Sequence, residues 1–142
     1  SRWLLLLDIL NILSKSKDIS LICNNVITGK NTAETLRMNQ VIDFVLKNFN
    51  REISIAEVAD LTNMAENSFS RYFSQRTRKS FTSFVNEVRL NHASKLLIET
   101  NKSVTTICME CGFNNLSNFN KQFLKVYQTR PLNFRKLYLN QD

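Results

Sequence analysis

Apolar residues recur at helical spacing in two adjoining runs toward the C-terminal end of the chain. The first run follows Ser103, a residue type that caps helices well: Val104, Ile107, Cys108 and Cys111. The pattern breaks at Gly112, and the second run then places Phe119 and Phe123 four residues apart, shortly before a proline. Two short helices joined by a tight turn that contains glycine form a helix-turn-helix. The pattern therefore predicts such a unit over residues 103–128.

A similar pair of runs lies earlier in the chain. Before the turn the two pairs match at an offset of 49: Ser54, Ile55, Val58 and Ala59 correspond to Ser103, Val104, Ile107 and Cys108. After the turn the offset is 50: Phe69, Phe73 and Phe84 correspond to Phe119, Phe123 and Phe134. This internal repeat predicts a first helix-turn-helix over residues 54–78, with one residue fewer in its turn. Residues 81–99 are expected to form a long connecting helix with these residues facing inward: Phe84, Val88, Leu96 and Leu97.

The segments before these units are also helical in pattern, so the predicted fold class is all-α. Residues 36–49 form an amphipathic run, and residues 2–15 form a run whose apolar positions nearly encircle the helix. Residues 19–35 show few periodic positions and are expected to be a linker that can include a short helix. The chain contains only two glycines and one proline, and it has no sustained alternating pattern of the kind that predicts strands. Two parts are expected, residues 1–35 and residues 36–142.

Positive charge is concentrated in the part of the chain that holds the two predicted units. The 142 residues carry a formal net charge of +7. Residues 63–139 contain twelve Lys and Arg against four Asp and Glu, a net of +8, and the remainder contains seven against eight, a net of −1. A localised basic excess of this kind favours a polyanionic partner. An anionic membrane is disfavoured, because the cations are spread over several short helices instead of one basic amphipathic helix.

The string ECGFNNLSNFNKQF closely resembles the second helix-turn-helix of the AraC/XylS family of bacterial transcription regulators. The residues that carry the resemblance are Ile107, Glu110, Cys111, Gly112, Phe113, Asn114, Asn115, Ser117, Phe119, Asn120, Phe123, Pro131 and Phe134. The DNA-binding region of this family also contains two helix-turn-helix units, and the resemblance covers about residues 39–138. It implies an activator or repressor that binds double-stranded DNA sequence-specifically, with two recognition helices in successive major grooves.

The resemblance also implies parts and partners beyond the DNA-binding region. In the family, a helix in the place of residues 2–15 usually closes a sensing and dimerising domain, and the chain begins at Ser1 and not at Met. Residues 1–35 are therefore interpreted as a remnant of that domain followed by the linker. The alternative is that the helix over residues 2–15 packs on its own domain. The implied partners of the full-length protein are double-stranded DNA, a second copy in a homodimer, and RNA polymerase. The implied location is the bacterial cytoplasm, at the nucleoid.

Polar residues opposite the phenylalanines are the predicted DNA contacts. At about 100° per residue they point away from the apolar face, and amides, hydroxyls and cations are the groups that reach bases and phosphates. By resemblance, the base-reading positions are Asn67, Ser70 and Arg71 in the first unit and Ser117, Asn118, Asn120 and Lys121 in the second. The expected phosphate contacts are Gln75, Arg76, Arg78, Lys79, Lys125 and Arg130. Leu116 also aligns with a reading position, but it is expected nearer the core.

Three positions depart from the family pattern. Recognition helices of the family typically end in Thr-Gly, but Arg78 and Gln128 occupy the glycine positions here, and Asn63 replaces a glycine in the first turn. A non-glycine residue in the left-handed conformation costs on the order of 1 kcal/mol, and Asn tolerates that conformation best. Arg89 matches an arginine of the family's connecting helix and is expected to pair with a carboxylate in a structural role.

The sequence shows no arrangement of residues for catalysis, and neither enzyme activity nor a cofactor is expected. Cys108 and Cys111 form a CxxC pair, but the other candidate ligands are only Cys23 and His92, so a structural role without metal is predicted. His92 lacks the partners of a catalytic triad, and the two glycines form no phosphate-binding loop. The three cysteines suggest no disulfide framework, which favours a reducing cytoplasm. The alternative function is a basic helical interaction module that binds an acidic protein partner.

Overall fold

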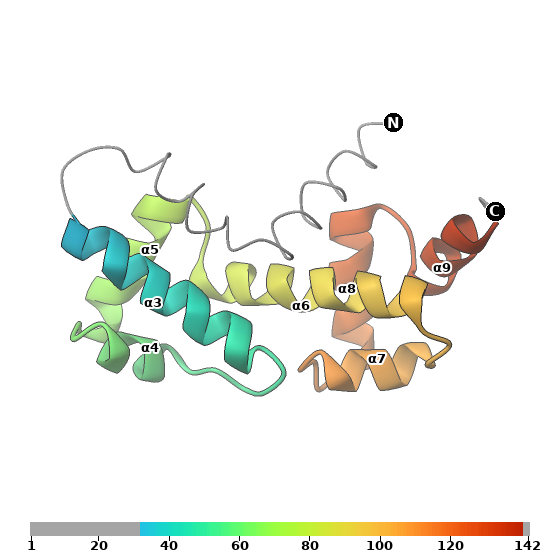
Figure 1. The fold of residues 1–142 in the computed structure, drawn as a ribbon, viewed down its shortest axis with the longest axis horizontal. Helices are drawn as coiled ribbons and strands as arrows, with labels where there is room; N and C mark the ends of the chain where they lie inside the picture. The colour runs from blue at the N-terminus through green and yellow to red at the C-terminus, as the bar shows by residue number, and fades with distance from the viewer. Residues whose placement is uncertain (1–31, 141–142) are drawn as a thin grey trace. The chain divides into compact units, whose positions relative to one another are not determined.

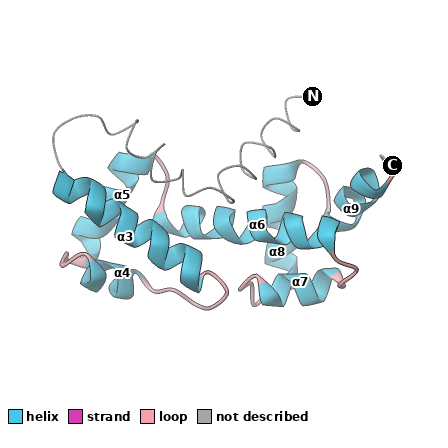
Figure 2. Cartoon of the chain, in the orientation of Figure 1, coloured by secondary structure: helices cyan, strands magenta, loops and turns pink. Residues whose placement is uncertain are grey.

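The computed structural model describes residues 32–140 of the 142-residue chain. Within this range the regular structure is entirely helical (Figures 1 and 2): α3 Thr32–Asn48, α4 Ile55–Leu61, α5 Glu66–Thr77, α6 Phe81–Glu99, α7 Val104–Glu110, α8 Leu116–Tyr127 and α9 Pro131–Leu139. Helices α4 and α5 form one helix-turn-helix, α7 and α8 form the other, and α6 connects them. The predicted fold class is confirmed. The helix expected over residues 2–15 lies outside the described residues.

Helix α3 begins earlier than the apolar pattern predicts. It starts at Thr32, so the linker predicted over residues 19–35 extends too far. Polar residues fill the first turn of α3, where Glu34 favours the helix N-terminus electrostatically but adds no apolar signal. From Phe44 onward the described residues form one compact unit that contains both helix-turn-helix pairs. None of the described helices combines the length and apolar character needed to cross a bilayer.

Capping and aromatic packing define the first helix-turn-helix. Ser54 caps α4 by accepting a hydrogen bond from the backbone amide of Glu57 at 3.2 Å. In α5, Phe69 and Phe73 are fully buried, and each ring meets the ring of Phe81 edge-on with centroids 5.4 Å apart. The periodic phenylalanines of the sequence therefore form the core of this unit.

The second helix-turn-helix repeats this architecture. Ser103 caps α7 by accepting a backbone amide hydrogen bond at 3.1 Å, and Asn115 caps α8 in the same way at 2.9 Å. Phe119 and Phe123 are fully buried, and the Phe123 ring meets Phe134 edge-on with centroids 5.3 Å apart. Equivalent serines thus cap α4 and α7, and equivalent rings hold the two recognition helices, α5 and α8. The N-termini of the recognition helices differ, because Asn115 caps α8 whereas Ala65 gives α5 no side-chain cap.

Both turns contain a residue in the left-handed backbone conformation, and so does the C-terminal end of each recognition helix. Asn63 and Gly112 occupy corresponding places in the turns, with φ of 55° and 91°. Helices α5 and α8 end at Arg78 and Gln128, with φ of 58° and 59°. The chain therefore keeps the left-handed geometry at positions where the family has glycine, and it bears the steric cost of a side chain there.

Helix α6 buries different faces along its length, because it serves both units. Its buried apolar residues are Phe81, Val85, Leu90, Ala93 and Leu97. Figure 1 shows α4 and α5 at one end of α6, and α7, α8 and α9 at the other. Of the four residues expected to face inward, Leu97 is buried, and three are only half-buried: Phe84, Val88 and Leu96. A single apolar stripe does not describe a helix whose covered side changes between its ends.

Helix α9 closes the second unit, although the apolar pattern does not predict it. Pro131 lies in its first turn, where the missing N–H leaves no hydrogen bond unmade. From α9, the Arg135 side chain donates hydrogen bonds to the backbone oxygens of Leu97 at 2.9 Å and Lys102 at 2.6 Å. Helix α9 therefore holds the loop that leads from α6 into α7.

Arg89 has the expected structural role, but the predicted carboxylate partner is wrong. Its Nε donates to the backbone oxygen of Phe49 at 2.8 Å, and its terminal nitrogen donates to the backbone oxygen of Arg51 at 2.8 Å. The guanidinium also lies over the Phe113 ring, 5.7 Å from its centroid. The loop between α3 and α4 presents carbonyl groups without helical partners, and Arg89 satisfies them.

Candidate nucleic-acid interface

Helix α8 presents the second set of predicted base-reading residues on its solvent side. Ser117, Asn118 and Lys121 are exposed, and Asn120 is half-buried. The opposite side of α8 is anchored by the two buried phenylalanines at positions 119 and 123. Because these rings are fixed in the core, the rotation of α8 about its axis is fixed, and the polar side chains are held outward.

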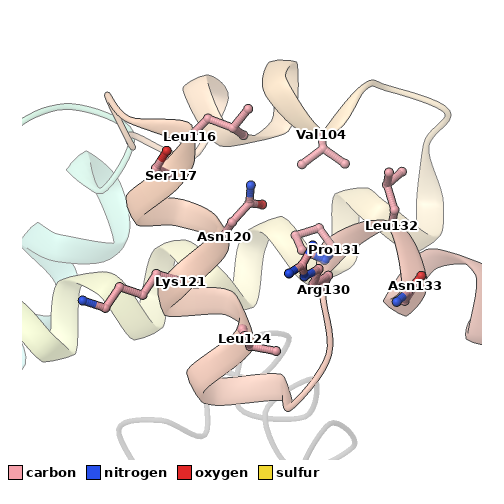
Figure 3. Close-up of a pocket in the computed structure, with 10 residues that line it drawn as sticks. All are labelled: Val104, Leu116, Ser117, Asn120, Lys121, Leu124, Arg130, Pro131, Leu132 and Asn133. Atoms are coloured by element: carbon pink, nitrogen blue, oxygen red, sulfur yellow. The ribbon is translucent and has the colours of Figure 1, made fainter.

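An open groove of about 780 Å³ runs beside α8 and combines residues from α7, α8 and the start of α9. Its polar lining residues are Ser117, Asn120, Lys121, Arg130 and Asn133, and its apolar ones are Val104, Leu116, Leu124, Pro131 and Leu132. Figure 3 shows Asn120 pointing from α8 toward the side that carries Val104, with Arg130 on the far side of the groove. The groove thus brings three predicted base-reading residues together with one predicted phosphate contact.

Leu116, which is expected nearer the core, belongs to this groove. It is the first residue of α8, it is half-buried, and it lines the groove. Leu124 and Leu132 are 44% and 56% exposed in the same groove. Apolar side chains in such a place suit contact with the methyl group of thymine.

Two further groove residues, Leu132 and Asn133, were not among the predicted contacts. Both lie in the first turn of α9. The sequence does contain a signal for that turn, since Pro131 is a residue type favoured at the first position of a helix. Because Pro131 follows the last apolar run of the second unit, the apolar pattern alone does not place the next residues beside α8.

Helix α5 presents the corresponding face in the first unit. Its predicted contacts Asn67, Arg71 and Gln75 are exposed, and Ser70 is half-buried. The half-buried Ser70 corresponds to the half-buried Asn120, and the exposed Arg71 corresponds to the exposed Lys121. The internal repeat therefore extends from the buried rings to the outward side chains.

The predicted phosphate contacts differ in their surroundings. Arg78, Lys125 and Arg130 are exposed, and Arg76 is exposed with its guanidinium 5.6 Å from the centroid of the Tyr72 ring. Lys79 is half-buried, and its Nζ forms a salt bridge with a carboxylate oxygen of Glu87 at 2.6 Å. Lys79 therefore already has an anionic partner, which any phosphate group has to displace.

Cys108 and Cys111 are core residues of the second unit. Both are fully buried, and burial raises the pKa of both thiols, that of Cys111 to about 12. The Cys108 thiol donates a weak hydrogen bond to the backbone oxygen of Phe113 at 3.9 Å. Within residues 32–140, no cluster of three or more His, Cys, Asp or Glu side chains is placed to hold a metal ion.

His92 is a packing residue on α6. Its ring lies against the Phe49 ring with centroids 4.9 Å apart. Partial burial lowers the pKa of His92, and the positive charge of Lys95 lowers it further. The imidazole is therefore neutral at neutral pH, and it covers the Phe49 ring at the start of the α3–α4 loop.

Comparison with known proteins shows similarity to helix-turn-helix transcriptional regulators. Residues 58–137 match a family model described as a helix-turn-helix domain, which is more than half of the chain. An uncharacterised HTH-type transcriptional regulator of Haemophilus influenzae is 32% identical over 100 residues, which cover 70% of this chain and 34% of that protein. A regulator of Staphylococcus aureus is 26% identical over 99 residues, covering 70% of this chain and 13% of that protein. The chain spans a minor part of the length of these relatives.

Solved structures share the fold. A probable AraC family transcriptional regulator from Rhodopseudomonas palustris superposes with a TM-score of 0.67 at 27% identity, covering 72% of this chain and 96% of that one. The DNA-binding domain of AdpA, solved in complex with a target DNA, superposes with a TM-score of 0.70 at 20% identity, covering 74% of this chain and 95% of that one. From the sequence match and the shared architecture together, the chain belongs to the AraC-type helix-turn-helix family of transcription regulators.

Proposed function

We propose that residues 36–142 form a domain that binds double-stranded DNA sequence-specifically, with α5 and α8 in successive major grooves. The observation that carries this proposal is the pair of corresponding polar faces on α5 and α8, held in one compact unit. The major groove admits an α-helix, and its base edges are read by amide, hydroxyl and cationic side chains. Two helices read adjacent grooves of one duplex when they lie about 34 Å apart along it.

The two recognition helices are proposed to prefer different bases. Arg71 of α5 matches guanine, because its two parallel donors fit the O6 and N7 acceptors. Asn118 and Asn120 of α8 match adenine, and Leu116 suits the thymine methyl group. Helix α8 has the sequence LSNFNKQFLKVY, without Arg, Asp or Glu, and Lys121 lacks the fixed fork of arginine. The second half-site is therefore expected to be richer in A·T pairs and less strictly specified than the first.

Phosphate contacts supply the part of the affinity that is independent of sequence. We assign them to the exposed residues at the ends of the recognition helices and after them: Gln75, Arg76, Arg78, Lys125 and Arg130. Lys79 is assigned the same role only when its bridge to Glu87 opens. Each phosphate contact adds to the salt dependence of binding through the release of condensed counterions.

The remaining expectations concern the full-length protein. The Haemophilus and Staphylococcus relatives are described as transcriptional regulators, and this chain covers 34% and 13% of their lengths. We propose that the present domain supplies DNA binding to a bacterial activator or repressor that acts in the cytoplasm. A homodimer and contact with RNA polymerase are the partners proposed for the whole protein.

A selection experiment on randomised duplex DNA tests the base assignments. Arg71→Ala is expected to blur one half-site and Lys121→Ala the other, roughly one helical turn away, because each loses base contacts worth about 1–3 kcal/mol. Lys125→Ala is the matched control. It is expected to weaken binding evenly across sequences and to flatten the salt slope by about one unit.

Two outcomes would contradict the proposal. If Arg71→Ala and Lys121→Ala relax the same base positions, the two helices do not read separate half-sites. If the wild-type chain shows no sequence preference in gel-shift competition, the basic surface serves another partner, and the alternative of an acidic protein partner gains support.

A further inference from the structure

The turn of the second unit lies directly against the loop that leads into the first. Gly112 has φ of 91°, and a Cβ placed on it would overlap the backbone oxygen of Phe49 and lie 3.1 Å from the backbone carbon of Asn50. The same Cβ would lie 3.0 Å from Nε of Arg89. Glycine therefore serves two purposes here, since it permits the left-handed turn and also a close approach between two backbones.

Arg89, on the connecting helix, contacts both of these segments. Its two hydrogen bonds to the backbone oxygens of Phe49 and Arg51 hold the α3–α4 loop, and its guanidinium lies over Phe113, the residue after Gly112. Burial lowers the pKa of Arg89, and the negative charge of the Glu52 carboxylate counteracts this. We call this set the junction: the loop at residues 49–51, Arg89, and the turn at Gly112 and Phe113.

The junction gives the two units a second connection besides α6. On the first unit's side, Arg51 also forms a salt bridge with Glu57 of α4 at 2.9 Å, so the loop is tied to the helix that supports α5. On the second unit's side, Gly112 and Phe113 lie in the turn that leads into α8. A single helix allows the elements at its ends to tilt, whereas two connections restrict both their tilt and their distance.

We propose that the junction fixes the spacing at which α5 and α8 read their half-sites, and that Arg89 and Gly112 are positioning residues for this purpose. This inference rests on the proposed DNA-binding function. A shift of one base pair moves a half-site by about 3.4 Å and rotates it by about 35°, because a helical turn of DNA contains 10–10.5 base pairs. A rigid pair of helices cannot follow that shift, while a pair joined by α6 alone follows it in part.

The test uses the 142-residue chain and duplexes that carry its two selected half-sites at the selected spacing and at spacings one and two base pairs longer or shorter. Wild type is expected to lose about tenfold or more in affinity at a shift of one base pair, which equals the loss of one base contact. Arg89→Lys keeps the charge but loses the fork that holds two carbonyls, and Gly112→Ala separates the two backbones. Both variants are expected to lose about threefold or less at the same shift.

Arg135→Lys is the matched control. Arg135 makes the same kind of bidentate contact with backbone carbonyls, at Leu97 and Lys102, but all of its partners lie in or next to the second unit. It is expected to lower the melting temperature, as Arg89→Lys does, while keeping the wild-type spacing profile. A purely stabilising role of Arg89 would move the melting temperature alone.

The outcomes separate the two proposals. If the wild type is selective for spacing and Arg89→Lys keeps that selectivity, the junction does not set the spacing and this inference fails, whatever happens to the folding of Gly112→Ala. If circular dichroism shows that Arg89→Lys no longer folds, the spacing selectivity of Gly112→Ala decides instead. If neither variant folds, these residues are required for folding, and a role confined to positioning is overturned. If the wild type shows no sequence preference, the proposed function is wrong, and the inference that rests on it is wrong as well.

Discussion

Arg78 and Gln128 adopt a backbone conformation that glycine reaches without steric cost. Both have φ near 60°, and both end a recognition helix. In this conformation the Cβ of a side chain conflicts with the backbone, so other contacts in the folded chain must outweigh that cost. Gln128 partly offsets it, because its side-chain nitrogen donates a hydrogen bond to the backbone oxygen of Lys125 at 2.9 Å.

Gln128→Gly is therefore expected to stabilise the domain. Removing the left-handed strain is worth on the order of 1 kcal/mol, from which the lost side-chain hydrogen bond and the greater flexibility of glycine in the unfolded chain subtract. A rise of a few degrees or less in the melting temperature is expected by calorimetry. Asn63→Gly is the control and should gain less, because Asn tolerates φ of 55° better. A lower melting temperature for Gln128→Gly would mean that this position is not strained.

At the scale of elements, α6 carries the carboxylate that pairs with Lys79. The Lys79 and Glu87 side chains are 37% and 48% exposed, so the bridge contributes little to stability. Its effect on binding is larger, since it places a negative charge beside a predicted phosphate contact. The second unit contains a bridge with the same spacing of eight residues, between Lys102 and Glu110 at 2.9 Å.

Glu87→Gln is expected to strengthen DNA binding and to steepen its salt dependence by about one unit, because Lys79 becomes available for a phosphate group. Affinity measured at several salt concentrations gives both quantities. Glu110→Gln removes the same charge from a bridge whose lysine is not a predicted contact, so it should leave the salt slope nearly unchanged. Equal slopes for the two variants would show that net charge, and not the release of Lys79, governs the effect.

At the scale of the whole molecule, the sequence predicts what repeats locally. Phe69, Phe73, Phe119 and Phe123 mark the two recognition helices, and Gly112 marks the second turn, because helix periodicity and turn chemistry act over a few residues. The outward faces of α5 and α8 follow from the same periodicity. The fold and most of the groove residues on α8 were therefore predictable.

Features that depend on distant parts of the chain were not predictable in this way. Arg89 was expected to meet a carboxylate, but its partners are carbonyl oxygens about forty residues away, and no periodicity encodes them. Leu116 lies in a groove whose other walls come from α7 and α9, so its surroundings depend on parts of the chain outside its own helix. The role of α9 beside α8 depends on how the chain reverses at Pro131. In each case tertiary contact decides, and the local pattern leaves it open.

The burial of Cys108 and Cys111 has a kinetic consequence. Both thiols lie in the second unit and are fully buried, and their raised pKa values keep them protonated. A thiol-modifying reagent therefore reacts with them only when that unit opens and exposes the sulfur atoms. With Cys23→Ser, these two are the remaining cysteines of the sequence. The half-life of labelling then measures how often the second unit opens locally. Opening of the first unit gives no signal, because that unit contains no cysteine. A bound duplex that requires α8 in place is expected to lengthen that half-life, and a duplex that carries only the first half-site is expected to leave it unchanged.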